Sequence, residues 1–132
     1  MAETFGDQIR IIFKDFPLNT HPQAFKAAEG AQCARVQGRF WEYHDTLFAN
    51  QGALAIADLK RYAGELSLDQ AAFDNCLDSG ETASLVQQDL AEAERYGISS
   101  TPTLFINGRM VAGALPYETF AELISDELAR VR

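Results

Sequence analysis

The sequence predicts an α/β domain in which one strand is followed by about five helices, a two-stranded hairpin and a final helix. Three observations lead to this prediction. Residues 9–13 carry apolar side chains on both faces, as expected for a buried strand. Residues 22–96 repeat apolar residues at helical spacing, with breaks at turn residues. Asn107–Gly108 separates two short runs of strand composition, which is the strongest short-range signal for a β-hairpin.

The first half of the chain begins with the strand predicted for residues 9–13, whose more polar side still carries an isoleucine. Pro22 then fits the first turn of a helix that runs to about Gln37. After Gly38, two apolar stripes at helical spacing predict a largely buried helix. The stripes are Phe40, Tyr43 and Leu47 on one side, and Trp41, His44 and Phe48 beside them.

Three more helices are predicted before the hairpin. The first covers Asp58 to Glu65, and Ser67 to Gln70 has the spacing of a capping box that starts the second. Ser79–Gly80 interrupts the pattern, and a longer helix then ends at Gly97, a residue suited to a left-handed cap. The apolar positions of these last two helices are Phe73, Cys76, Leu77, Leu85, Val86, Leu90, Ala93 and Tyr96.

The hairpin is predicted from residues 103–112, and Pro116 opens the final helix. Because proline cannot donate to a β ladder, Pro102 belongs at the first position of its strand, where a cis peptide in a tight turn is one option. The backbone groups of Ser100 and Thr101 are then free to bind an extended peptide. A plain structural role, in which a proline turn simply starts a strand, fits the same residues equally well.

Composition sets limits on function. The 132 residues, 47% of them hydrophobic, are enough for one domain with one core. A formal charge of −8, with eleven scattered Lys and Arg, argues against binding to nucleic acid or anionic membranes. No apolar stretch approaches the roughly 20 residues that span a bilayer, and the first residues lack the pattern of a signal peptide. The compartment is therefore left open.

Several segments together resemble the DsbA-like branch of the thioredoxin fold, whose members oxidise or isomerise disulfides in exported proteins. The resemblance covers nearly the whole chain and rests on residues 11–18, 21–22, 27–33, 40–45, 47–51 and 101–108. It implies one domain over residues 1–132, with a DsbA-type helical insertion at 21–97. It also implies that Ser100, Thr101 and Pro102 bind an extended or unfolded polypeptide, and that the protein works in the periplasm or outside the cell.

This chain departs from the DsbA-like pattern at its start. Members carry an upstream strand and a CxxC motif that opens the first helix, and this sequence contains neither. The favoured interpretation is a thiol-disulfide oxidoreductase domain that is truncated and redox-inactive, with no catalytic residue and no cofactor. Two alternatives remain. One is a natural peptide-binding module that has discarded catalysis, and the other is an isomerase or glutathione-transferase type of the same superfamily, whose catalytic serine would also lie upstream.

The resemblance has a consequence for the sheet. The missing strand is the central one, between the strand predicted for residues 9–13 and that of residues 103–106, so the thioredoxin-like fold is incomplete. Each unpaired buried backbone group costs about 1 to 3 kcal/mol, in a domain stable by only about 5 to 15 kcal/mol. Either the remaining strands pair directly, or a second copy supplies a strand. A homodimer is the expectation.

Cys33 and Cys76 are the only cysteines and are 43 positions apart, so they are not a CxxC pair. Both fall on inward stripes, and some DsbA-like members carry an additional pair in this region, which suggests a structural disulfide. Two buried free thiols are the alternative. The two histidines, His21 and His44, lack the spacing of metal ligands and are interpreted as structural, so no metal site is expected.

Overall fold

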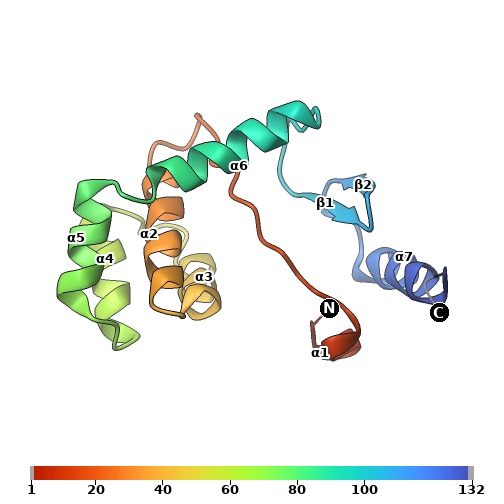
Figure 1. Ribbon diagram of the computed structural model, residues 1–132, viewed down its shortest axis with the longest axis horizontal. Coiled ribbons are helices and arrows are strands. Elements are labelled where there is room, and N and C mark those ends of the chain that lie inside the picture. Colours follow the sequence, from red (N-terminus) through yellow and green to blue (C-terminus); the bar gives the residue numbers. More distant parts are fainter. Residues whose placement is uncertain (1, 131–132) are drawn as a thin grey trace. The chain divides into compact units, whose positions relative to one another are not determined.

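The computed structural model describes residues 2–130. Its elements, in chain order, are α1 (Ala2–Phe5), the 3-10 turn η1 (Gly6–Gln8), α2 (Ala24–Val36), α3 (Phe40–Ala49), α4 (Ile56–Glu65), α5 (Gln70–Ser79), α6 (Ala83–Arg95), β1 (Thr103–Ile106), β2 (Arg109–Ala112) and α7 (Tyr117–Arg130) (Figure 1). The chain divides into two compact units. The helical unit comprises residues 15–92, and the hairpin unit comprises the described residues up to Lys14 together with those from Ala93 onward.

The helical unit is built around α2, which contacts α3, α4 and α5 (Figure 1). Small residues on α2 allow this close approach. A Cβ atom added to Gly30 would lie only 3.0 Å from the Tyr43 hydroxyl oxygen. That hydroxyl is buried and donates a 2.9 Å hydrogen bond to the carbonyl oxygen of Leu59, which ties α3 to α4. The buried core consists of Ala27, Ala31, Cys33, Ala34, Tyr43, Leu59, Tyr62, Ala63, Leu68, Phe73, Cys76 and Leu77.

The helices predicted in this region are confirmed, but one helix cap is corrected. The prediction that α3 is largely buried is also wrong, because Tyr43 is its only buried residue and Trp41 and Phe48 are 43% and 58% exposed. The capping box predicted to start at Ser67 is not formed, because α5 begins only at Gln70 and Asp69 is its N-cap. The Asp69 carboxylate accepts a 3.1 Å hydrogen bond from the Ala72 backbone N–H. Ser67 instead lies at φ +59°, in the turn that ends α4. Asp69 sits two residues nearer the helix and offers an equally good cap, so it displaces the serine.

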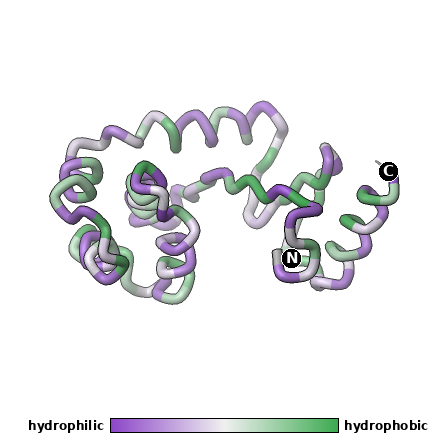
Figure 2. The backbone as a smooth tube through the Cα atoms, turned by 60° about the horizontal axis from the view of Figure 1, so that its bottom comes forward, coloured by the Kyte–Doolittle hydropathy of each residue, from purple (hydrophilic) through white to green (hydrophobic). Residues whose placement is uncertain are grey.

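The hairpin unit contains β1, β2 and α7. β1 and β2 pair antiparallel, with Ile106 opposite Arg109, so the connection is the two-residue turn that Asn107–Gly108 predicts. Both turn residues have positive φ, +49° and +85°, as the favoured hairpin turn requires. On α7, Phe120 and Ile124 are buried. The alternation of hydrophilic and hydrophobic residues along α6, which leads into this unit, can be followed in Figure 2.

The strand predicted for residues 9–13 is wrong. In residues 2–130 the sheet contains β1 and β2 alone, and residues 9–13 have no regular secondary structure. The side chains of Ile11 and Ile12 are 48% and 61% exposed. Strand composition is a local property, whereas a strand also requires a ladder of backbone hydrogen bonds with a neighbouring strand, and residues 9–13 belong to no such ladder among the described residues. Direct pairing of residues 9–13 with β1, one of the two expected solutions, is therefore not what the chain adopts.

Candidate functional site

The predicted peptide-binding residues Ser100, Thr101 and Pro102 form an exposed loop immediately before β1. The end of α6 directs the chain into this loop: Gly97 lies at φ +72°, and the Ile98 N–H donates to the Ala93 carbonyl oxygen at 3.0 Å. This is the hydrogen-bonding pattern of a Schellman cap. The sequence prediction that Gly97 ends this helix in a left-handed cap is confirmed.

Two hydrogen bonds fix the loop to the hairpin. The Thr103 hydroxyl donates to the Ser100 carbonyl oxygen at 2.8 Å. The Pro102 carbonyl oxygen accepts from the Gly113 N–H at 2.9 Å, which continues the ladder by one residue beyond β1. The Thr101–Pro102 peptide bond is cis. The loop is thus held at a defined position while its three side chains remain exposed to solvent.

β1 has one edge that no described strand occupies, because β2 is its sole partner among residues 2–130. In the observed register, Ile106 and Leu104 exchange hydrogen bonds with β2, since a two-residue turn closes on Ile106 and Arg109. The backbone N–H and C=O groups of Thr103 and Phe105 consequently point toward the other edge. This edge, together with the loop of Ser100–Pro102, is called the β1 edge site below.

Apolar side chains lie beside the β1 edge site. Phe105 and Met110 are directly opposite each other across the hairpin and therefore share one face. They are 44% and 54% exposed, and the exposed ring of Tyr96 lies 5.7 Å from that of Phe105, centroid to centroid. On the other face, Leu104 and Ile106 are half-buried. The exposed face thus offers an aromatic surface next to unpaired backbone groups.

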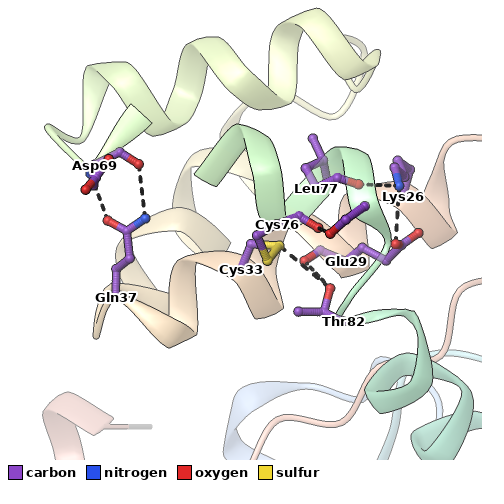
Figure 3. The surroundings of a disulfide bond; sticks show 9 residues. Lys26, Glu29, Cys33, Gln37, Asp69, Cys76, Leu77 and Thr82 are labelled. Carbon is purple, nitrogen blue, oxygen red and sulfur yellow. Dashed lines mark hydrogen bonds and ion pairs between the residues drawn. A yellow bond between two sulfur atoms is a disulfide. The ribbon is translucent and has the colours of Figure 1, made fainter. Parts of the chain in front are cut away.

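Cys33 on α2 and Cys76 on α5 are brought together at disulfide distance, with 2.10 Å between their sulfur atoms and 5.9 Å between their Cα atoms (Figure 3). Their side chains are only 1% and 6% exposed. Around the pair, the Thr82 hydroxyl lies 3.7 Å from the Cys33 sulfur and donates to the Glu29 carbonyl oxygen at 3.0 Å. The disulfide therefore lies within the buried core of the helical unit.

A buried polar cluster in the helical unit was not anticipated from the sequence. Asp15, 4% exposed, accepts a 2.8 Å hydrogen bond from Gln32 Nε2, and its backbone N–H donates to Asp89 Oδ2 at 2.8 Å. Burial raises the pKa of the Asp15 carboxyl to about 6; the Gln32 hydrogen bond opposes this shift and the nearby Asp89 carboxylate adds to it. Asp15 and Asp89 are 74 positions apart, so local sequence patterns carry no signal for their contact.

The two histidines do not assemble a metal site. His44 Nδ1 lies 3.0 Å from Asp45 Oδ1, and the rings of Phe40, Trp41 and Phe48 surround the imidazole. His21 is exposed just before α2. Within residues 2–130, no group of three or more His, Cys, Asp or Glu side chains converges as metal ligands would. In the same part of the chain, no helix has the length and apolar character needed to cross a membrane.

Comparisons with known proteins add a family and a group of relatives. A family model described as thioredoxin matches residues 3–126. The chain is 39% identical over 125 residues to Na(+)/H(+) antiporter NhaA 3 of Salinispora tropica, a match that covers 94% of this chain and 19% of that protein. It is 37% identical over 120 residues to Na(+)/H(+) antiporter NhaA of Herminiimonas arsenicoxydans, covering 91% and 19%. The chain thus spans about a fifth of these curated relatives. No solved structure gives a significant match.

Proposed function

Because this chain belongs to the thioredoxin family, we propose that it is a DsbA-like thiol-disulfide oxidoreductase domain that binds extended polypeptide at the β1 edge site and is itself redox-inactive. One observation carries the proposal. The only two cysteines of the 132 residues are both buried and bonded to each other in the helical unit. The loop of Ser100–Pro102 is exposed, and one edge of β1 pairs with no described strand.

The proposed lack of redox turnover is supported by thiol chemistry. Exchange begins with attack by an exposed thiolate whose pKa is lowered by a helix N-terminus or a nearby cation. Cys33 lies within α2 and Cys76 within α5, and neither is exposed. We expect this chain to accelerate neither the reduction of insulin by dithiothreitol nor the refolding of a scrambled disulfide substrate. An active thioredoxin serves as positive control, and turnover above the protein-free rate would contradict the proposal.

Polypeptide binding at the β1 edge site is supported by the combination of unpaired backbone groups and the adjacent aromatic surface. An extended chain that adds a strand to a sheet edge gains main-chain hydrogen bonds, and side-chain contacts at alternate positions give preference. The substrate class is therefore an unfolded, apolar segment. The acidic surface, with a net charge of −8, favours segments that also carry basic residues.

A binding measurement tests this proposal. Fluorescein-labelled, reduced and carboxamidomethylated ribonuclease A, a basic protein that stays unfolded after this treatment, is the probe, and anisotropy reports binding. Phe105→Ser should weaken binding about 5- to 30-fold, because it removes about 1 to 2 kcal/mol of aromatic contact. Phe48→Ser is the matched control, since Phe48 on α3 is 58% exposed but belongs to the helical unit. Equal losses in both variants, or none in Phe105→Ser, would rule out the site.

A second copy of the chain is the partner expected when no polypeptide is bound. Residues 9–13 have strand composition and exposed isoleucines, and β1 has an unpaired edge, so strand exchange across a two-fold axis satisfies both. We propose a homodimer of this kind. Light scattering after size exclusion should give twice 14.6 kDa, and the unfolded probe should compete with dimerisation. A single species of 14.6 kDa at micromolar concentration would exclude it.

The curated relatives favour one further role for the same domain. Identity of 39% over 94% of the chain to a protein named as a Na(+)/H(+) antiporter supports the proposal that this domain works attached to, or alongside, an antiporter of that kind. Binding between this chain and the remaining part of the Salinispora tropica relative, produced separately in detergent, is the test. Salt-resistant binding supports the role, and its absence at high micromolar concentration opposes it.

A further inference from the structure

A buried glutamate links the β-hairpin to the last helix. Glu127 on α7 is only 6% exposed, and glutamate is rarely buried to this degree unless it is paired. Its Oε1 atom accepts from Arg130 Nη1 at 3.0 Å and from Arg109 Nη1 at 3.5 Å. Arg130 lies three residues further along the same helix, whereas Arg109 is the first residue of β2. The pair of Arg109 and Glu127 therefore connects the hairpin to α7 across 18 positions of sequence.

The register of the hairpin shows which of its faces is turned toward α7. Arg109 is opposite Ile106, and Val111 is opposite Leu104, so these four side chains share one face of the two strands. Arg109 reaches Glu127 from this face, and β1 contacts α7. The three apolar members of the face are half-buried. The hairpin is thus docked on α7 through this face, and the aromatic surface beside the β1 edge site remains on the other.

Docking matters for the β1 edge site, because a hairpin of two short strands is marginal in water unless it packs on a helix or gains a third strand. The edge presents the backbone groups of Thr103 and Phe105 in register only while the hairpin is formed. A polypeptide that adds a strand there consequently binds the docked hairpin. Its apparent affinity falls with the fraction of molecules in which the hairpin is docked.

The ion pair of Arg109 and Glu127 favours the docked hairpin. A buried carboxylate that loses a partner is destabilising, because its charge is then incompletely compensated. Without the guanidinium of Arg109, the cation that still contacts Glu127 in the described part of the chain is Arg130, which is 70% exposed and screened by solvent. Undocking then becomes easier, because it allows water to reach the carboxylate.

We propose that Arg109 is a positioning residue for polypeptide binding: through Glu127 it holds the hairpin on α7, and it thereby controls how much of the protein offers an ordered β1 edge. Arg109 belongs to β2, which pairs with the opposite edge of β1, so it acts through the hairpin and not by contact with the bound segment. The inference rests on the proposed binding at the β1 edge site. The docking of the hairpin itself is measurable with no polypeptide present.

Hydrogen exchange of the whole unliganded chain, followed by mass spectrometry, tests the docking. Arg109→Gln should lower the protection of the peptide covering residues 103–112 by about 3- to 30-fold, between the effects of breaking an exposed and a fully buried ion pair. Arg130→Gln is the matched control, since it removes the other guanidinium from the same oxygen but leaves the link between β2 and α7 intact. Equal losses in the two variants, or no loss in Arg109→Gln, would overturn the proposal.

Binding of the unfolded ribonuclease A probe in a urea series tests the effect on the site. At the urea concentration where the affinity of the parent has fallen to half, a docking equilibrium weakened 3- to 30-fold corresponds to about 2- to 15-fold weaker binding by Arg109→Gln. Arg130→Gln should follow the parent. Trp41, the single tryptophan, lies in the helical unit, and its fluorescence should show that this unit is still folded in all three chains.

The binding series also separates two kinds of failure. If the parent chain does not bind the probe, the proposed function fails and this inference fails with it. If the parent binds and Arg109→Gln binds equally well throughout the series, the inference alone is wrong. Arg109→Lys keeps a cation at this position and should lie between the parent and Arg109→Gln, which gives a reading if the glutamine variant fails to fold.

A double variant distinguishes positioning through Glu127 from a general loss of stability. Arg109→Gln combined with Glu127→Gln should dock no more weakly than Arg109→Gln alone, because the neutral amide leaves no charge buried without its partner. The same comparison applies to the affinity for the probe. Losses that simply add would show that the two side chains act separately, and would overturn the proposal.

Discussion

Replacing both cysteines by alanine is expected to lower the free energy of unfolding by about 4 kcal/mol, as the chain-entropy model gives for a closed loop of this size. Cys33 and Cys76 are 43 positions apart in the sequence, so the bond removes much of the freedom of the unfolded chain. Alanine leaves the surroundings apolar and small. A loss of this size is a large share of the total stability of a domain, about 5 to 15 kcal/mol.

Urea unfolding followed by far-UV circular dichroism measures this effect. The parent chain with its disulfide reduced by dithiothreitol is the matched control, because it lacks the bond but keeps both sulfur atoms. Reduced parent and double variant should have nearly the same midpoint, well below that of the oxidised parent. If the oxidised and reduced chains unfold together, the bond contributes nothing to stability and the core of the helical unit is self-sufficient.

Asp15→Asn is expected to stabilise the protein by about 2 to 3 kcal/mol at pH 8 and by close to nothing at pH 4. The pKa of this carboxyl is about 6 in the folded chain, raised from an ordinary value of 3.8. A raised pKa means that the folded state binds more protons between these values. The stability it contributes is complete below pH 3.8 and is lost as pH rises through about 6. Asparagine does not titrate and suffers no such loss.

Chemical denaturation at pH 4.5, 6 and 8 provides the measurement. The difference between variant and parent should grow across this series and level off above pH 7, whereas Asp126→Asn, at an exposed aspartate of α7, should track the parent throughout. A constant difference would mean that Asp15 does not titrate in this range. A variant less stable than the parent at pH 8 would show that the carboxylate of Asp15, rather than the neutral acid, is the form that the folded protein favours.

The sequence was a good guide to features that are local. Asn107–Gly108 predicted the hairpin and its register, because both residues tolerate the positive φ of the turn. Gly80 and Gly97 marked two helix ends for the same reason. The inward positions of Cys33 and Cys76 also followed from helical periodicity alone, although periodicity left open whether the two thiols would be bonded.

Features that depend on distant residues were missed. Residues 9–13 have strand composition, but a strand exists only where a neighbour pairs with it, and composition says nothing of that neighbour. Ser67 matched the pattern of a capping box, but the N-cap of α5 is Asp69, which directly precedes the first residue of that helix. The contact between Asp15 and Asp89 joins a loop to a helix 74 positions away, and neither residue belongs to a recognisable motif. Sequence reasoning therefore identified the exposed loop before β1, whose peptide binding stays a prediction, but not the contact between Asp15 and Asp89.

The hairpin has a consequence for the dynamics of its unit. Two strands of four residues each are marginal in water by themselves and persist when packed on a helix. β1 contacts α7, whose Phe120 and Ile124 are buried. The hairpin and α7 should therefore open as one cooperative unit. The backbone amides of Thr103–Ile106 should lose their protection from hydrogen exchange under the same conditions as the amides of α7. A polypeptide bound at the free edge of β1 should therefore also stabilise α7, even without contacting that helix.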